Sequence, residues 1–335
     1  MSIALTMALS GWIILDKPVG LGSTQAVAAV KRALREAGEA KTKVGHGGTL
    51  DPLASGVLPI ALGEATKLAG RMLDATKAYD FTIRFGEKTD TLDREGKVIV
   101  TSDVRPTLAE IEAILLRFTG KIEQVPPAYS ALKVEGERAY DLARAGKDVE
   151  LKARQVTVHE LSILPGTGRG TAERSSVVAG EPGQTTSPLH QPAAGPPPRP
   201  GEDQITLSVT VSKGTYIRSL ARDVAHALGT VGHVTMLRRT KAGPFTLEQA
   251  ISLDFLNDAA KARQLTRTVL PLEAGLDDIP ALPVTPEQAQ LLRHGQQLFG
   301  VPAVPGLHLA TEGTTPVALV EVSDDGCKVV RGFNL

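Results

Sequence analysis

Hydrophobic and polar positions alternate in two long segments of the chain, residues 79–85 and residues 205–211. Successive side chains of a strand point to opposite faces of a sheet, so this alternation predicts half-buried strands. Shorter patterns predict strands at residues 11–15, 97–101 and 156–158. We expect residues 79–85 and 97–101 to pair as a hairpin with a long connection.

Apolar residues spaced three and four positions apart predict helices between these strands. One helix begins with Ser23 as its cap and ends at Gly38, and another begins with a capping box of Thr107 and Glu110. A third follows the strand at residues 205–211. This mixture predicts an α/β (α+β) fold with helices flanking a sheet.

The last part of the chain is predicted to be a separate domain. Thr285 and Gln288 form a capping box, and residues 316–322 and 327–331 have the pattern of two short strands. We therefore expect residues 276–335 to form a small β-rich domain and residues 1–275 to form the main one.

A segment of forty residues, 165–204, differs from the rest in composition. It contains eight prolines and seven glycines and lacks aromatic residues. Such a segment buries too little apolar surface to offset its ordering entropy, so it is predicted to be a disordered insertion between two strands of one sheet. The alternative is an interdomain linker, which requires an independent core after Ile205.

The overall composition is that of an ordinary soluble protein, with 335 residues, 42% hydrophobic and 22% charged. The N-terminus lacks a basic leader and the chain lacks a transmembrane stretch, so we expect a cytoplasmic protein. The one cysteine, Cys327, excludes an intrachain disulfide and a cysteine-based metal site.

Formal net charge is zero, but its distribution is uneven. Residues 205–250 carry six basic and two acidic side chains, and residues 251–335 carry six basic and ten acidic ones. The basic region, which includes Arg218, Arg238 and Arg239, is expected to offer a surface for phosphates. The alternative is that these charges are only solvated surface residues.

Residues 43–66 combine glycines, a histidine, an aspartate and two prolines in a way that favours a reaction centre. Asp51 precedes Pro52, which restricts its backbone to extended or turn conformations. A carboxylate on a stiff turn, with His46 nearby, suits a nucleophile or a base. The alternative is that Asp51 caps a helix beginning at Pro52. Sequence motifs for zinc proteases, nucleotide triphosphates and serine nucleophiles are absent.

Six motifs occur in order along residues 11–245: LDKPVGLGST, VGHGGTLDPLASGVLPIALGEATK, KAYDFTIRFG, TDTLD, QVPPAYSALKVEGERAYDLAR and SKGTYIRSLARDVAHALG. Together they closely resemble the bacterial TruB family of tRNA pseudouridine synthases. The resemblance implies isomerisation of a uridine in the T-loop of tRNA, at position 55. It also implies a mostly antiparallel mixed sheet with a catalytic cleft, and a small PUA-like domain at the C-terminus.

The resemblance also assigns roles to residues. It implies that Asp51 is the catalytic aspartate, that Tyr79 stacks on the target base and that Arg218 pairs with the aspartate. By the same resemblance, Tyr216 is a second active-site tyrosine and Leu237 is an apolar contact to the base. His46 is a histidine that engages the T-loop during base extrusion, and Lys67 and Asp93 are supportive polar residues. Without the motifs, Tyr79 and Leu237 would be interpreted as core residues and Arg218 as a surface charge.

The chemistry of this isomerisation needs neither a metal nor an organic cofactor, because it changes no oxidation state and consumes no water. Asp51 could attack C6 of the base, or attack or deprotonate the ribose, and the sequence leaves these routes open. The expected partner is the T-arm of tRNA, bound by a monomer that requires no protein partner and no membrane. Two alternatives are that tRNA refolding is the main task and that the chain is a guide-RNA-dependent relative.

Overall fold

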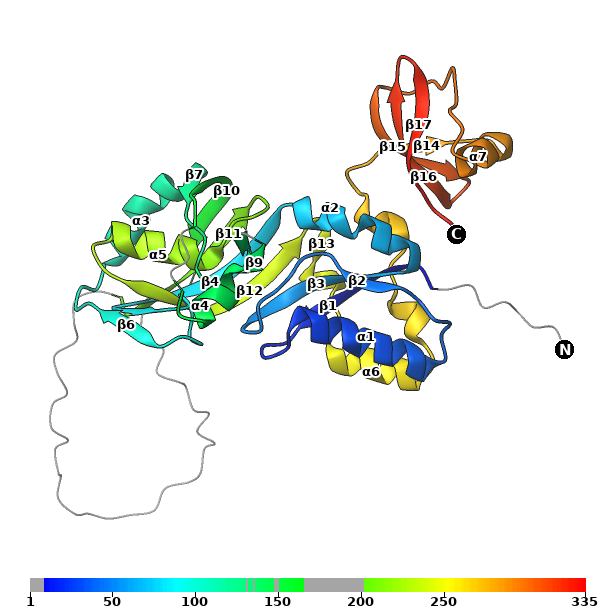
Figure 1. Cartoon of the computed structure of the whole chain (residues 1–335). Helices are drawn as coiled ribbons and strands as arrows, with labels where there is room; N and C mark the ends of the chain where they lie inside the picture. Colours follow the sequence, from blue (N-terminus) through cyan, green and yellow to red (C-terminus); the bar gives the residue numbers. More distant parts are fainter. Residues whose placement is uncertain (1–8, 131, 135, 148–150, 166–201) are drawn as a thin grey trace, which may run out of the picture. The chain divides into compact units, whose positions relative to one another are not determined.

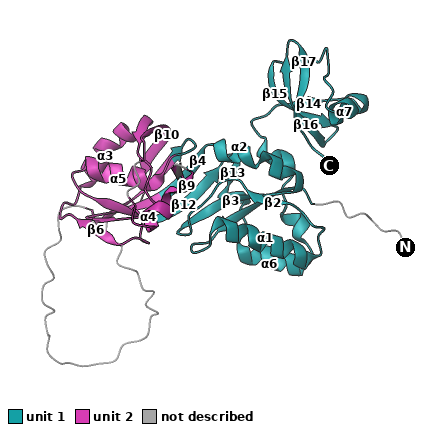
Figure 2. Cartoon of the chain, in the orientation of Figure 1, with its two compact units in different colours: residues 1–80, 210–214, 236–335 teal, residues 81–209, 215–235 magenta. Residues whose placement is uncertain are grey.

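The structure is a computed structural model that describes residues 9–130, 132–134, 136–147, 151–165 and 202–335. Most of the predicted insertion at 165–204 therefore lies outside the described residues. The chain divides into two compact units, which Figure 2 shows in different colours. Unit 1 comprises residues 1–80, 210–214 and 236–335, and unit 2 comprises residues 81–209 and 215–235.

The largest sheet within the described ranges has nine strands (Figure 1). Hydrogen-bonded neighbours follow the order β1-β3-β12-β4-β11-β10-β7, while β2 pairs with β3 and β13 with β12. The strands are β1 Gly11–Lys17, β2 Val44–His46, β3 Ala54–Leu62, β4 Lys77–Phe85, β7 Gly120–Gln124, β10 Arg154–Ile163, β11 Gln204–Val211, β12 Gly232–Ala242 and β13 Phe245–Thr246. Pairing is antiparallel for β1–β3, β2–β3, β10–β7 and β12–β13 and parallel for β12–β3, which confirms the expected mixed, mostly antiparallel sheet.

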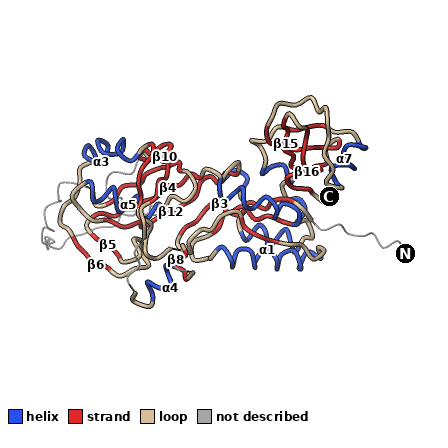
Figure 3. Tube along the Cα trace, turned by 45° about the horizontal axis from the view of Figure 1, so that its top comes forward, coloured by secondary structure: helices blue, strands red, loops and turns tan. Residues whose placement is uncertain are grey.

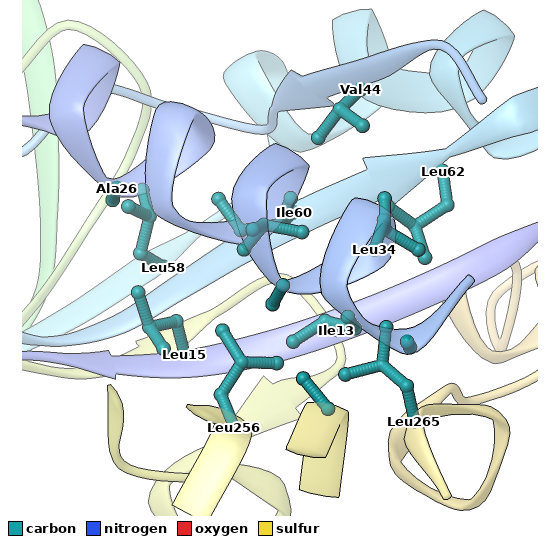
Figure 4. Close-up of a cluster of buried hydrophobic side chains, with 14 of the residues drawn as sticks. Ile13, Leu15, Ala26, Leu34, Val44, Leu58, Ile60, Leu62, Leu256 and Leu265 are labelled. Carbon is teal, nitrogen blue, oxygen red and sulfur yellow. The ribbon is translucent and has the colours of Figure 1, made fainter. Parts of the chain in front are cut away.

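In unit 1, helices α1 (Ser23–Ala37) and α6 (Leu253–Lys261) cover one face of β1 and β3. Figure 4 shows the side chains between them, which include Ile13 and Leu15 of β1 and Leu58 and Ile60 of β3. All four of these side chains are fully buried. The buried apolar residues on this face are here called the helix-side cluster: Ile13, Leu15, Ala26, Val30, Ala33, Leu34, Ala37, Val44, Leu50, Ala54, Leu58, Ile60, Leu62, Leu256, Ala260 and Leu265.

The opposite face of the same strands is buried as well. Trp12, Ile14 and Val57 pack there with residues of the 3-10 helix η1 (Gly63–Leu68) and of α2 (Ala69–Asp74). Strands buried on both faces read as continuous apolar runs instead of alternating ones. This explains why β3, whose last seven residues are all buried, gives no alternating pattern in the sequence.

The C-terminal region is rich in strands, as expected (Figure 3). Its sheet has the order β14-β15-β16-β17, and helix α7 accompanies it. Thr285 caps α7 by accepting a hydrogen bond from the backbone of Gln288, which confirms the predicted capping box. The elements are β14 Ala281–Pro283, α7 Pro286–Arg293, β15 Gly306–Glu312, β16 Thr315–Ser323 and β17 Gly326–Gly332.

Unit 2 contains the two other predicted helices. Helix α3 (Leu108–Leu115) begins with the predicted capping box, and α5 (Ile217–Ala227) buries Ile217, Leu220 and Val224. Strand β11 shows the alternating burial that its sequence predicts. The remaining elements of the chain are β5 Glu87–Thr89, β6 Val98–Thr101, η2 Leu116–Phe118, β8 Lys133–Val134, β9 Glu137–Arg138, α4 Ala139–Arg144, η3 Leu247–Gln249, η4 Leu265–Thr268 and η5 Leu272–Gly275.

Two local predictions are wrong. Strand β6 pairs with β5 in a small sheet of its own, and not with β4, because Gly86 with a φ of 89° ends β4 and the next residues begin a new strand. Helix α1 has Gly22 at its N-cap position, and the hydroxyl of Ser23 bonds to Leu50 instead of capping the helix. Among the described residues, helices long and apolar enough to span a membrane are absent.

Candidate active site

Asp51 lies in unit 1 on the loop between β2 and β3. Pro52 and Leu53 form a turn, and the backbone then enters β3 at Ala54, whose N–H donates to the carbonyl of Asp51 at 3.0 Å. The alternative in which Asp51 caps a helix beginning at Pro52 is therefore wrong. The side chain of Asp51 is partly exposed, as a group that acts on a substrate must be.

The backbone on either side of Asp51 is bound to the segment that follows β1. Ser23 Oγ donates to the carbonyl of Leu50 at 2.9 Å and accepts from its N–H at 2.8 Å. The N–H of Gly20 donates to the carbonyl of Pro52 at 2.8 Å. The two bonds between Ser23 and Leu50 are buried, and buried hydrogen bonds are costly to break, so they define the path of the loop before Asp51.

Lys17 is fully buried at the end of β1, beside this loop. Its ammonium donates to the carbonyls of Leu21 at 2.7 Å, Pro18 at 3.0 Å and Pro52 at 3.5 Å. Burial lowers the pKa of Lys17 to about 8, and the carboxylate of Asp51 opposes this decrease. Lys17 and Asp51 are thus close enough to interact electrostatically.

Tyr79 and Leu237 are both partly buried, and both pack against the helix-side cluster. Leu237 of β12 pairs in parallel register with Ala54 of β3, and Ala54 follows Asp51 by three residues. The two residues are therefore at the margin of the core, where an apolar side chain can contact a ligand and the interior together. Their contacts to a base remain predictions.

His46 ends β2, five residues before Asp51, and is partly buried. Burial, together with the charge of Arg239, lowers the pKa of His46 below 6.5, so its imidazole is neutral at neutral pH. Its Nδ1 is buried and lacks a hydrogen-bond partner. The next residue is Gly47, where a Cβ would lie 2.6 Å from Cβ of Met72, so packing requires glycine at this position.

Lys67 has contacts of another kind. Its ammonium lies 2.6 Å from Glu64 Oε2 and donates to the carbonyl of Gly332 at 2.9 Å. The same carboxylate oxygen of Glu64 accepts from the backbone of Asn334. The structure thus places Lys67 where η1 meets the end of the C-terminal region.

In unit 2, Arg218 and Asp93 come together as a buried ion pair. Arg218 Nη1 lies 3.2 Å from Asp93 Oδ2, and both residues are 8% exposed. The guanidinium also donates to the carbonyls of Thr91 at 2.9 Å and Tyr129 at 3.0 Å. Several directed bonds of this kind hold the plane of the guanidinium in one orientation.

Tyr216 occupies the N-cap position of α5, two residues before Arg218. Its backbone N–H donates to Oε1 of Gln124 at 2.8 Å, and the guanidinium of Arg154 lies 5.0 Å from the centre of its ring. That distance is within the range of a cation–π interaction. Asp51 belongs to unit 1, while Tyr216 and Arg218 belong to unit 2, so the pairing of Arg218 with Asp51 remains a prediction.

Comparisons with known proteins decide the family. Residues 32–179 match the N-terminal domain of TruB family pseudouridylate synthases, and residues 218–277 match the C-terminal domain of tRNA pseudouridylate synthase B. The chain is 59% identical to tRNA pseudouridine synthase B of Novosphingobium aromaticivorans, over 98% of each chain. It is 55% identical to the protein of the same name from Zymomonas mobilis, over 98% of this chain and 97% of that one. The chain belongs to the TruB family.

Solved structures agree with this assignment at the level of the fold. The chain superposes with a TM-score of 0.65 on a chain of an H/ACA RNP bound to a substrate RNA containing 2'-deoxyuridine, at 23% identity, covering 97% of this chain and 85% of that one. A chain of a Cbf5-Nop10-Gar1 complex gives a TM-score of 0.64 at 25% identity, covering 97% and 84%. The family models and the curated relatives confirm the resemblance seen in the motifs, and the TruB family is one of tRNA pseudouridine synthases.

The burial of several polar side chains around the Asp51 loop was not predicted from the sequence. Lys17, Ser23 and Lys77 occur inside the motifs that carry the resemblance, but only their positions between apolar residues could have indicated burial. Arg239 was expected to face phosphates with its basic neighbours. That expectation is wrong, because Arg239 is 1% exposed and binds backbone carbonyls of unit 1.

Proposed function

We propose that this chain isomerises a uridine in the T-loop of tRNA, at position 55, to pseudouridine, with Asp51 as the catalytic group. Membership of the TruB family supports the reaction class, and the names of the relatives support tRNA as the substrate. The observation that carries the role of Asp51 is its place on a loop whose neighbouring residues, Leu50 and Pro52, are both bound to other segments.

The reaction breaks the bond between N1 of uracil and C1′ of ribose and forms a bond between C5 and C1′. A proton leaves C5 and N1 gains one, so substrate and product are isomers. Asp51 would act as the nucleophile, at C6 of the base or at the ribose, or as a base toward the ribose. A group held in place before the substrate arrives loses little freedom on reacting, which lowers the barrier.

The target base has to leave its stack before this chemistry can occur, because C1′, C5 and C6 are inaccessible in a stacked loop. In the proposal, Tyr79 stacks on the flipped base and Leu237 contacts it, since both lie at the margin of the helix-side cluster. His46 engages the T-loop as a neutral imidazole. Arg218, oriented by Asp93, pairs with Asp51, and Tyr216 completes the site from the start of α5.

We further propose that the chain acts on the T-arm as a cytoplasmic monomer without a protein partner or cofactor. The division into a catalytic domain, residues 1–275, and a PUA-like domain, residues 276–335, belongs to the same proposal. A separate hydrophobic cluster in the C-terminal region supports it, since Leu282, Leu298 and Cys327 pack together there.

The test uses purified protein and unmodified tRNA, with pseudouridine mapped by mass-labelled detection. Wild-type protein should modify position 55, and Asp51→Asn should slow turnover by at least about 10³-fold, because the amide cannot act as nucleophile or base. Asp258→Asn, a change at a carboxylate that is 77% exposed on α6, is the matched control and should retain activity.

Appreciable turnover by Asp51→Asn would remove Asp51 from the catalytic role. A wild-type protein that leaves bare tRNA unmodified would contradict the proposal that the chain acts alone. The same Asp51→Asn protein tests the refolding alternative, because rescue of misfolded tRNA by a protein without turnover would support a folding activity.

A further inference from the structure

The guanidinium of Arg239 donates hydrogen bonds to the loop that carries Asp51. Arg239 is on β12 and is among the largest fully buried side chains of the described chain. We propose that Arg239 is a positioning residue for Asp51, which it holds in place through the backbone of the loop. This inference rests on the proposed function, because it assigns a role in the same reaction.

The contacts of Arg239 reach both sides of Asp51. Its Nε donates to the carbonyl of Val57 at 2.7 Å, while Nη1 and Nη2 donate to the carbonyls of Thr49 at 3.4 Å and Gly48 at 3.3 Å. Gly48 and Thr49 precede Asp51 by three and two residues, and Val57 lies in β3. One rigid planar group therefore connects the start of the loop to the strand that follows it.

A close approach of two strands places Arg239 at this point. Arg239 pairs with Gly56 in the parallel register of β12 and β3. Gly56 has a φ of 100°, and a Cβ there would overlap the carbonyl oxygen of Arg239. Glycine at position 56 thus permits the approach that brings the guanidinium to the loop.

The other carbonyls of the loop are bound as well. Ser23 and Gly20 bind Leu50 and Pro52 from the segment that follows β1, and Ala54 donates to the carbonyl of Asp51 itself. Arg239 supplies the bonds on the opposite end, at Gly48 and Thr49. With every carbonyl from residue 48 to 52 accepting a bond, the backbone at Asp51 cannot shift without breaking one of them.

A merely structural arginine and a positioning arginine predict different kinetics. Loss of a structural contact lowers the stability of the protein and leaves the rate constant of the folded fraction unchanged. Loss of a positioning contact lowers that rate constant, because a displacement of about 1 Å in a reacting group can cost about 10²-fold. Binding of tRNA should change little, because the buried guanidinium of Arg239 is not accessible to the substrate.

The experiment measures single-turnover pseudouridine formation with enzyme in excess over tRNA, together with the Kd for tRNA and the Tm of each variant. Arg239→Lys keeps the positive charge but replaces the planar fork by a single ammonium. At a temperature well below the Tm of the variant, we expect its rate constant to fall about 10- to 100-fold. Its Kd for tRNA should stay within about threefold of wild type. Arg293→Met, which removes an arginine from the exposed pair with Glu312, is the control and should retain the wild-type rate.

Ser23→Ala keeps the test decisive if Arg239→Lys does not fold. It removes both bonds to Leu50 with a change of one atom, so the same loss of rate at unchanged Kd is expected, about 10-fold in size. Because both variants release one loop, their effects should combine non-additively in the double variant.

The proposal is overturned if the variants lose only thermal stability and keep the wild-type rate constant. It is also overturned if the loss lies in Kd alone, since Arg239 would then support binding and not positioning. Failure of wild-type protein to form pseudouridine would instead overturn the proposed function. Active wild-type protein with unaffected variants would overturn this inference alone.

Discussion

Arg239 in unit 1 and Arg218 in unit 2 are both buried, but they have different partners. Arg239 binds the carbonyls of Gly48, Thr49 and Val57, whereas Arg218 pairs with the carboxylate of Asp93 and binds two carbonyls. Carbonyls belong to the main chain, so Arg239 determines the path of a loop. A carboxylate carries a charge, so Asp93 balances and orients the guanidinium of Arg218.

The contrast extends to the lysines of unit 1. Lys17 and Lys77 are also buried and bind carbonyls, and the charge of Arg239 contributes to the lowered pKa of each. Unit 1 therefore stabilises these buried cations mainly with main-chain carbonyls, which belong to the Asp51 loop for Arg239 and to the end of α2 for Lys77. The two regions should respond differently to substitution, since an unpaired buried charge is more costly than an unpaired carbonyl.

The largest effect is expected when the carboxylate of unit 2 is removed. Asp93→Ala removes one carboxylate from a buried pair with Arg218, which should lower the free energy of unfolding by about 3–5 kcal/mol. Urea unfolding measures this loss. In the double variant Asp93→Ala, Arg218→Met, part of the stability should return, because the guanidinium no longer has to be buried without the carboxylate of Asp93. Losses that simply add would show that the pair does not interact as its geometry indicates.

A smaller effect is expected for Lys77, which donates to the carbonyls of Met72, Leu73 and Ala75 at the end of α2. Lys77→Met should cost about 1–3 kcal/mol in urea unfolding, because these carbonyls lose their donor. Lys31→Met, at an exposed lysine of α1, is the control and should change little. A loss as large as that of Asp93→Ala would contradict the distinction between carbonyl and carboxylate partners.

The pH dependence of Lys77 sharpens the same prediction. Burial, followed by the charge of Arg239, lowers the pKa of Lys77 to about 8 from 10.5. The unfolded chain therefore binds more protons than the folded one between these two values, so stability should rise with pH across that window. The rise should be weaker in Lys77→Met, and an equal rise in both proteins would show that Lys77 does not cause it.

The smallest effect is expected for His46, whose pKa is lowered below 6.5 by burial and by Arg239. As the pH falls through 6.5, His46 binds a proton more readily in the unfolded chain than in the folded one. The free energy of unfolding of the protein should therefore decrease toward acid pH. His46→Gln should reduce this loss, which is measured as the difference in unfolding free energy about one pH unit above and below 6.5. An unchanged difference would show that burial does not keep the imidazole neutral.

Prediction from sequence succeeded where one face of an element is buried and the other is not. Strand β11 follows its alternating pattern and helix α5 its helical one. In β4, Phe81, Ile83 and Phe85 are buried as predicted, but Thr82 on the other face is buried as well. Strand β3 was missed because helices and loops bury both of its faces, which leaves no period to detect. The predicted partner of β6 was wrong because residues 87–89, which were expected to belong to the connection, form the strand β5 that pairs with β6.

For the site, the motifs identified the family and implied a role for Asp51, which stays a prediction, but they did not reveal the contacts that hold its loop. Ser23 was interpreted as a helix cap, which is the commonest use of a serine at that position. Arg239 was grouped with its basic neighbours as part of a surface for phosphates, because the local excess of positive charge was the available signal. Its carbonyl partner Gly48 is distant in sequence, so only the folded chain reveals that the two residues are neighbours.

Gly56 limits which substitutions the chain can accept near the Asp51 loop. Its missing side chain lets β12 approach β3, so any larger residue would separate the strands and withdraw Arg239 from Gly48 and Thr49. Thr49, by contrast, is exposed and contributes only its main chain to Arg239. The loop thus tolerates changes of side chain at Thr49 but not of backbone geometry at Gly56, and redesign of its surface should leave the strand crossing untouched.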